Sequence, residues 1–133
     1  NQELDLSLNN SLVPFFGKHR KHRADIWFPW MFKFGVQPPH LATIFRLSYI
    51  RNFTYKTNLK IIADFVYFTN LFNHDPRYLT NNLYLVKMAS GGKTTSGIKS
   101  VIDTSFEFIS EYGIIKGFFM AVFRIPLKLI QAF

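Results

Sequence analysis

The chain has 133 residues, no cysteine and a net charge of +8. The absence of cysteine excludes disulfide bonds and thiolate metal sites, and the length suffices for one hydrophobic core. The positive charge favours an anionic partner, such as nucleic acid, phospholipid or a phosphorylated substrate. Aromatic residues make up 18% of the chain, which is typical of an aromatic core, a sugar-binding groove or a covered surface.

The first part of the chain combines a polar segment with a basic, aromatic one. Residues 1–12 are polar and are expected to be a leader that is frayed or ordered only by its surroundings. A basic cluster at 18–23 is followed by an aromatic run at 27–34. Basic and aromatic side chains interleaved in this way are typical of surfaces that bind nucleic acid. A basic, aromatic-rich nucleic-acid-binding module without catalysis is therefore one hypothesis.

Two strands are predicted on either side of the middle of the chain. Pro38-Pro39 excludes a helix, and residues 40–45 then read as a strand, followed by a short helix within 47–52. Residues 78–88 read as a second strand, with a break expected at Asn81-Asn82.

A helix is expected to begin around Asp64 and to extend to about Asn73, after a loop at 55–60. Apolar side chains recur at helical spacing through this segment, so one face of the helix belongs to the core. The residues of that face are Ile61, Phe65, Phe68 and Phe72. Pro76 ends the pattern, because proline is disfavoured inside a helix and restrains the residue before it.

The C-terminal part of the chain reads as a glycine loop followed by helix. Gly91-Gly92 opens the loop, and from Ile98 to the end the pattern is helical. Gly113 interrupts this helix, and Pro126 is expected to bend or end it.

Asp64 is the main candidate for catalysis. It follows a stretch, residues 17–63, in which Asp25 is the only acid among many Lys and Arg residues. A lone carboxylate facing a basic, aromatic wall stays ionised at neutral pH and suits a general base that works beside a negatively charged substrate. The alternative is that Asp64 only caps or charges the first turn of its helix, where a negative side chain is favourable.

His40 and the loop at 91–96 are candidate substrate contacts. His40 follows a rigid Pro-Pro turn, and its imidazole can donate or accept a hydrogen bond, although a structural role at a strand start explains it equally well. The loop offers backbone N–H groups, hydroxyls and the Lys93 ammonium, which suit a phosphate group, with an ordinary surface turn as the alternative. The histidines give no metal-ligand pattern, because His19 and His22 lie among Lys and Arg that repel a cation.

Three short motifs follow one another in the order Pro39-His40-Leu41-Ala42-Thr43-Ile44-Phe45, Ala63-Asp64-Phe65 and Gly91-Gly92-Lys93-Thr94. In this order and spacing they resemble the C-terminal half of family 2 glycosyltransferases of the non-processive bacterial polysaccharide type, over residues 36–97. The resemblance implies an α/β fold. Residues 1–97 would form a partial GT-A-like mixed sheet, the acceptor-side half that carries the catalytic base, and residues 98–133 would add C-terminal helices.

The resemblance also implies a reaction. A sugar would pass from a nucleotide-sugar donor to a hydroxyl of a glycan or lipid-linked acceptor, with inversion and with Asp64 as general base. The residues implied to contact the substrates are His40, Thr43, Gly91, Gly92, Lys93 and Thr94. The family's Asp-x-Asp, which holds a divalent metal (Mn or Mg) on the donor diphosphate, is not found in this chain. We therefore expect an acceptor-side fragment that binds no metal, is inactive alone and has no nucleic acid as partner.

The segment 114–130 is strongly apolar and carries only basic charges. Phe-rich faces beside Lys116, Arg124 and Lys128 favour a helix that lies on anionic lipid, and the segment is interrupted too often for a transmembrane span. A core helix that packs on the missing half of the enzyme is the alternative. We therefore expect a cytoplasmic protein, peripheral on the inner membrane face.

Overall fold

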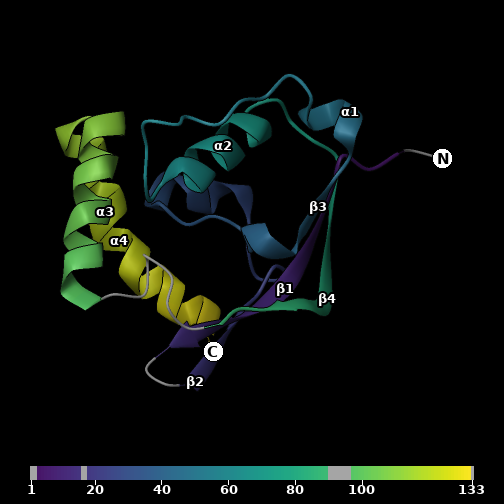
Figure 1. Ribbon diagram of the computed structural model, residues 1–133, viewed down its shortest axis with the longest axis horizontal. Helices are drawn as coiled ribbons and strands as arrows, with labels where there is room; N and C mark the ends of the chain where they lie inside the picture. Colours follow the sequence, from purple (N-terminus) through teal and green to yellow (C-terminus); the bar gives the residue numbers. More distant parts are fainter. Residues whose placement is uncertain (1–2, 16–17, 90–96, 133) are drawn as a thin grey trace.

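The computed structural model describes residues 3–15, 18–89 and 97–132. It is a mixed α/β structure with a four-stranded sheet and two C-terminal helices, as expected from the sequence. The elements, in chain order, are β1 (Leu6–Phe15), β2 (Lys18–His22), η1 (Pro29–Phe34), η2 (His40–Ala42), β3 (Thr43–Phe45), α1 (Leu47–Ile50), α2 (Ala63–Phe72), β4 (Tyr78–Lys87), α3 (Gly97–Tyr112) and α4 (Ile114–Ala132). Helix α2 lies between the sheet and α3, while α4 runs past α2 and contacts η1 and β2 (Figure 1).

Strand β1 is the centre of the sheet. Its first residues pair antiparallel with β3 and its last residues pair antiparallel with β2, so these two strands share one edge of β1. Strand β4 pairs parallel with the opposite edge, and the sheet is therefore mixed. The pairing of β4 shifts register between Thr80 and Tyr84 and again between Tyr84 and Val86. The strand itself is continuous, so the break expected at Asn81-Asn82 is not found and only the pairing is irregular there.

The prediction of a leader at 1–12 is wrong, because most of this segment belongs to β1. Leu6 and Leu8 are fully buried, and the buried side chains of Asn9 and Asn10 are hydrogen-bonded to distant partners. The Asn9 amide donates to the Ala42 carbonyl oxygen at 2.9 Å, and the Asn10 side-chain oxygen accepts from the Ala24 N–H at 2.6 Å. Buried polar side chains are tolerated when they are hydrogen-bonded in this way.

The strand predicted at 40–45 is only half correct. Residues His40–Ala42 form the short 3-10 helix η2, and only Thr43–Phe45 pair as β3. The Thr43 hydroxyl donates to the Pro39 carbonyl oxygen at 3.0 Å and closes this turn. Such a local hydrogen bond offers the backbone an alternative to the strand ladder.

Aromatic side chains from distant segments meet in the core on one face of the sheet. Trp27, 1% exposed, contacts Phe32 and Phe72 edge to face, with ring centroids 5.1 Å apart in both pairs. The apolar face of α2 supplies Phe65 and Phe68, which confirms the helix predicted from about Asp64 to about residue 73. Of the aromatic run at 27–34, Trp27 and Phe32 are therefore part of the core, while Phe28 and Trp30 are exposed.

Helices α3 and α4 form a tight hairpin. Gly113 lies between them with a φ of +83°, as expected from the interruption in the helical pattern. Gly117 approaches the backbone of α3 so closely that a Cβ there would lie 2.4 Å from the Phe108 carbonyl oxygen. Pro126 lies inside α4 and does not end it. Phe108 and Met120 extend from the hairpin into the common core.

Candidate functional site

Asp64 lies in the first turn of α2, and 40% of its side chain is exposed. Its Oδ2 lies 3.4 Å from Nε2 of His40, whose side chain is 30% exposed. The two residues belong to separate sequence motifs, and the fold brings them together at one solvent-accessible position. Both remain open enough to meet a substrate.

The His40 ring is oriented by Gln37. The Gln37 side-chain nitrogen lies 3.0 Å from His40 Nδ1. An amide nitrogen can only donate, so Nδ1 accepts and the ring proton of neutral His40 is placed on Nε2. That nitrogen is the one that lies 3.4 Å from the Asp64 carboxylate oxygen.

Tyr55 is the second partner of Asp64. Its hydroxyl donates a hydrogen bond to the Asp64 carboxylate, and its ring stacks on Tyr67 with centroids 4.1 Å apart and planes 6° from parallel. Partial burial, the negative charge of Asp64 and the hydrogen bond together raise the pKa of Tyr55 to about 12. The Tyr55 hydroxyl therefore keeps its proton at neutral pH and can donate a hydrogen bond.

Glu107 on α3 caps the start of α2. One carboxylate oxygen accepts the Lys60 N–H at 3.0 Å, and the other accepts the N–H groups of Ile61 and Ile62 at 2.9 and 3.0 Å. Burial opposes ionisation of Glu107, but these N–H groups outweigh it and hold the pKa of Glu107 below its ordinary value. The helix start is thus capped from another element.

This cap bears on the alternative interpretation of Asp64. The residue before α2, Ile62, has no side-chain cap, and the backbone N–H groups there point at Glu107 and not at Asp64. Asp64 still lies in the first turn, where its charge is favourable. Its carboxylate oxygens, however, face His40 and Tyr55, so a capping role does not account for its geometry.

The structure gives the partners of some of the basic residues expected around Asp64. His40 lies 3.4 Å from Asp64, while two of the cations that precede Asp64 in sequence contact other acids. Lys56 pairs with Glu111, and Arg46 lies 2.7 Å from Glu3. These pairs join residues that are distant in sequence, so a count of charges along the sequence does not predict them.

The remaining predicted site residues fall into two groups. Thr43 does not point its hydroxyl at Asp64 but uses it to close the turn that carries His40. Asn9 supports the same turn through the Ala42 carbonyl. Gly91, Gly92, Lys93 and Thr94 lie outside the described residues.

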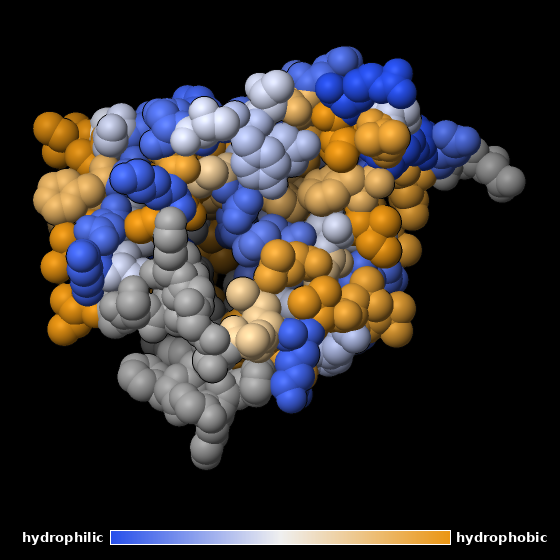
Figure 2. Space-filling model, viewed as in Figure 1, coloured by the Kyte–Doolittle hydropathy of each residue, from blue (hydrophilic) through white to orange (hydrophobic). Residues whose placement is uncertain are grey.

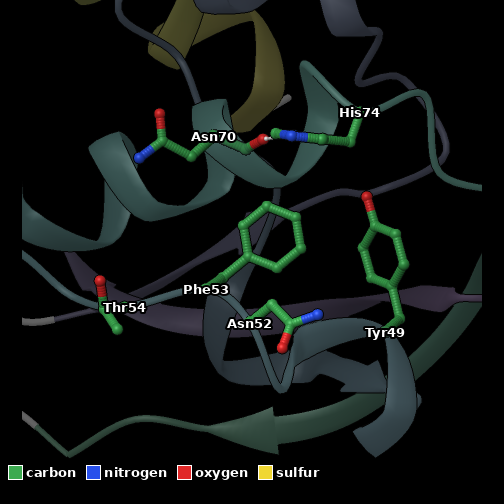
Figure 3. Close-up of a pocket in the computed structure, with 6 residues that line it drawn as sticks. All are labelled: Tyr49, Asn52, Phe53, Thr54, Asn70 and His74. Carbon is green, nitrogen blue, oxygen red and sulfur yellow. Dashed lines mark hydrogen bonds between the residues drawn. The ribbon is translucent and has the colours of Figure 1, made fainter.

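A shallow pocket of about 490 Å³ lies at the other end of α2 (Figure 3). Its walls are the rings of Tyr49, Phe53 and His74, with centroids of neighbouring rings 5.0 to 5.5 Å apart. Two amides and a hydroxyl complete the lining, which is Tyr49, Asn52, Phe53, Thr54, Asn70 and His74. Rings combined with neutral hydrogen-bonding groups suit an uncharged ligand rich in hydroxyls. The chain passes directly from Thr54 to Tyr55, so one loop connects this pocket to the Asp64 site.

Sequence reasoning identified Asp64 and His40 but missed Tyr55 and Glu107. Neither has a local signature, because Tyr55 lies in a loop and Glu107 is one of several acids on α3. Within residues 3–15, 18–89 and 97–132, no cluster of three or more His, Asp or Glu side chains could hold a metal ion. In the same segments, no helix is both long and apolar enough to cross a membrane.

Comparison of the chain with protein-family models, with curated proteins and with solved structures found no match.

Proposed function

We propose that the chain is the acceptor-side part of an inverting glycosyltransferase in which Asp64 is the general base. The observation that carries the proposal is the meeting of His40 and Asp64 at 3.4 Å at an open position. These residues come from two of the three motifs that resemble family 2 glycosyltransferases. The mixed sheet and the C-terminal helices are compatible with the acceptor-side half of such an enzyme.

The proposed chemistry at Asp64 is a single displacement. A carboxylate oxygen of Asp64 takes the proton of the acceptor hydroxyl while the hydroxyl oxygen attacks the anomeric carbon of the donor sugar. The bond from that carbon to the nucleoside diphosphate breaks, and its electron pair leaves with the diphosphate. Attack opposite the leaving group inverts the anomeric carbon. General-base catalysis of this kind contributes about two to four orders of magnitude in rate.

His40 and Tyr55 position the base. Tyr55 donates a hydrogen bond to the carboxylate and His40 lies 3.4 Å from it, and together they restrict its orientation, which favours a productive geometry with the acceptor. Thr43 acts indirectly, through the turn that carries His40. The backbone N–H groups of Gly91 and Gly92, with the side chains of Lys93 and Thr94, suit the diphosphate of the donor.

The aromatic and amide lining of the pocket in Figure 3 supports a carbohydrate acceptor. A glycan or a lipid-linked sugar presents hydroxyls to amides and apolar faces to rings, as this lining requires. The described residues offer no ligand set for the divalent metal that such enzymes hold on the donor.

The burial of Trp27 and Phe32 reduces the aromatic surface that a nucleic-acid-binding module would use. Stacking on bases needs exposed rings beside the basic cluster. Trp27 and Phe32 are instead packed in the core, and of this run Phe28 and Trp30 are the strongly exposed aromatic side chains. The proposal accordingly includes no nucleic acid partner.

The test is the replacement Asp64→Asn in the complete enzyme. We expect turnover to fall by about two to four orders of magnitude, with folding and donor binding retained, because the amide cannot accept the proton. The matched control is Asp103→Asn on the exposed side of α3, which should leave turnover unchanged. Near-normal turnover of Asp64→Asn would remove this residue from the mechanism.

A second test uses the chain by itself. Calorimetry with UDP- and GDP-sugars in the presence of Mn²⁺ or Mg²⁺ should show weak binding, and no transfer should occur. Clear micromolar binding would contradict the assignment of the donor and metal sites to another part of the enzyme.

A further inference from the structure

Helix α3 is amphipathic, but polar side chains lie on its buried side and apolar side chains on its exposed side. Its polar residues Ser100 and Thr104 are buried, together with Phe108, against the rest of the domain. Its opposite side is exposed and apolar, at the helical spacing expected for one stripe. The residues of that stripe are Ile98, Val101, Ile102 and Phe106. Figure 2 shows apolar atoms along the margin of the molecule where α3 lies.

Helix α4 continues this apolar surface. Gly117 and Met120 face α3 and the core, and the residues on the other side of α4 are exposed. They are Ile114, Ile115, Phe118, Phe119, Val122, Phe123 and Ile125. Ile115 is 89% exposed, which is far from the burial expected of an isoleucine in a folded domain.

A row of aromatic rings connects α4 to η1. Phe34 contacts Phe119 and Phe123, with ring centroids 5.6 and 5.8 Å apart. On its other side Phe34 contacts Trp30 at 5.7 Å, and Trp30 is about half exposed. The outer hairpin surface, defined here as the exposed apolar residues of α3 and α4 with Trp30, therefore ends on a tryptophan. Tryptophan is enriched where proteins meet the membrane–water interface.

The charges of the hairpin are arranged so that the outer surface is flanked by cations. Lys99 and Lys116 are exposed. Of the acids on α3, Glu107 is bound to backbone N–H groups at the start of α2, and Glu111 is paired with Lys56. Asp103 is the remaining acid and lies one turn from Lys99. Two of the three acids on α3, Glu107 and Glu111, are thus directed toward the domain, and the exposed charges beside the apolar surface are those of Lys99, Lys116 and Asp103.

We propose that the outer hairpin surface docks on an anionic lipid bilayer, with α3 and α4 lying in the plane of the interface. An exposed apolar area that spans two helices marks a partner surface. Flanking lysines and a terminal tryptophan fit a bilayer better than a second protein, because the cores of protein interfaces are depleted in lysine. Since the other sides of both helices are packed on the domain, only this surface is left to contact lipid. The proposal does not depend on the transferase chemistry.

The test is co-sedimentation of the full chain with vesicles of phosphatidylcholine, with and without phosphatidylserine. We expect binding that rises with the phosphatidylserine content. It should fall as salt is raised from about 0.1 M to about 1 M, because the screening length drops from about 10 Å to about 3 Å. The proposal would be overturned if binding depended on neither the phosphatidylserine content nor the salt concentration, or if no binding were seen.

Matched substitutions locate the surface. Phe118→Glu and Ile115→Glu together should lower vesicle binding by about tenfold or more, because they place charge where apolar burial is required. The control is Leu83→Glu on β4, which belongs to the sheet and not to the hairpin, since Leu83 and Phe118 are almost equally exposed at 63% and 62%. The control should bind vesicles like the unmodified chain. Equal loss in both variants would overturn the assignment to the hairpin.

Two further measurements complete the test. Lys99→Glu with Lys116→Glu keeps the apolar residues and should remove the dependence on phosphatidylserine, and an unchanged dependence would contradict the role given to the lysines. Light scattering in lipid-free buffer should show a monomer. A dimer that dissociates in the Phe118→Glu variant would instead assign this surface to a second copy of the chain.

Discussion

Replacing Glu107 with glutamine should destabilise the fold more than the same replacement at Glu111 on the same helix. Glu107 accepts three backbone N–H groups at 2.9 to 3.0 Å, and those of Ile61 and Ile62 are partly buried. Glutamine keeps the shape and one acceptor oxygen, but it loses the charge and presents N–H groups to other N–H groups. Hydrogen bonds to a charged group contribute about 1.5–3 kcal/mol each, and the exposed bond to Lys60 can be replaced by water. We therefore expect a loss of about 2 kcal/mol in the free energy of unfolding.

The control replacement removes a surface ion pair. Glu111 pairs with Lys56, whose side chain is 46% exposed, and such pairs contribute about 0–1 kcal/mol. For a domain of this size, 1 kcal/mol corresponds to about 3–5 °C in melting temperature. Thermal unfolding followed by circular dichroism should thus show a decrease of about 8 °C for Glu107→Gln and a clearly smaller one for Glu111→Gln.

The pH dependence provides an independent check on Glu107. Its pKa in the folded protein lies below the ordinary value of 4.5, so its contribution is complete above that pH and is lost as the pH falls through the folded-state pKa. The difference in stability between the unmodified chain and Glu107→Gln should therefore be constant near neutrality and shrink below about pH 4.5. Equal melting shifts for the two variants, or a difference that grows on acidification, would refute the reasoning.

Three further replacements test the packing and the site. Gly117→Ala should cost about 3 kcal/mol, measured by urea unfolding, because the new Cβ would lie 2.4 Å from a backbone oxygen of α3. Asn9→Ala should cost about 1–3 kcal/mol in the same assay, since it leaves the buried Ala42 carbonyl without its donor. Tyr55→Phe in the complete enzyme should keep the fold but lower turnover about ten- to a hundredfold, because Asp64 loses a donor that orients it.

The elements that local patterns specify were predicted correctly. Helix α2 follows from apolar residues at helical spacing, and the boundary between α3 and α4 follows from a glycine that adopts a positive φ. In each case the signal lies within a few residues of the feature, so tertiary contacts are not needed to infer it.

The segment at 1–12 shows where composition misleads. Asparagine and serine are depleted in strands because their side chains compete with the backbone for hydrogen bonds. In β1 that competition is resolved by partners far along the chain, the Ala42 carbonyl for Asn9 and the Ala24 N–H for Asn10. No local pattern indicates these partners, so the central strand of the sheet was taken for a leader.

The sequence by itself determined which chemical groups are present, and it indicated Asp64 and His40 as candidates. It also placed an apolar, basic segment at the C-terminal end. Only the tertiary structure decided that His40 and Tyr55 face the Asp64 carboxylate, that Glu107 caps α2 and that the apolar sides of α3 and α4 face outward. The physical reason is that hydrogen bonding and burial depend on proximity in space, and here that proximity is created by contacts between residues distant in sequence.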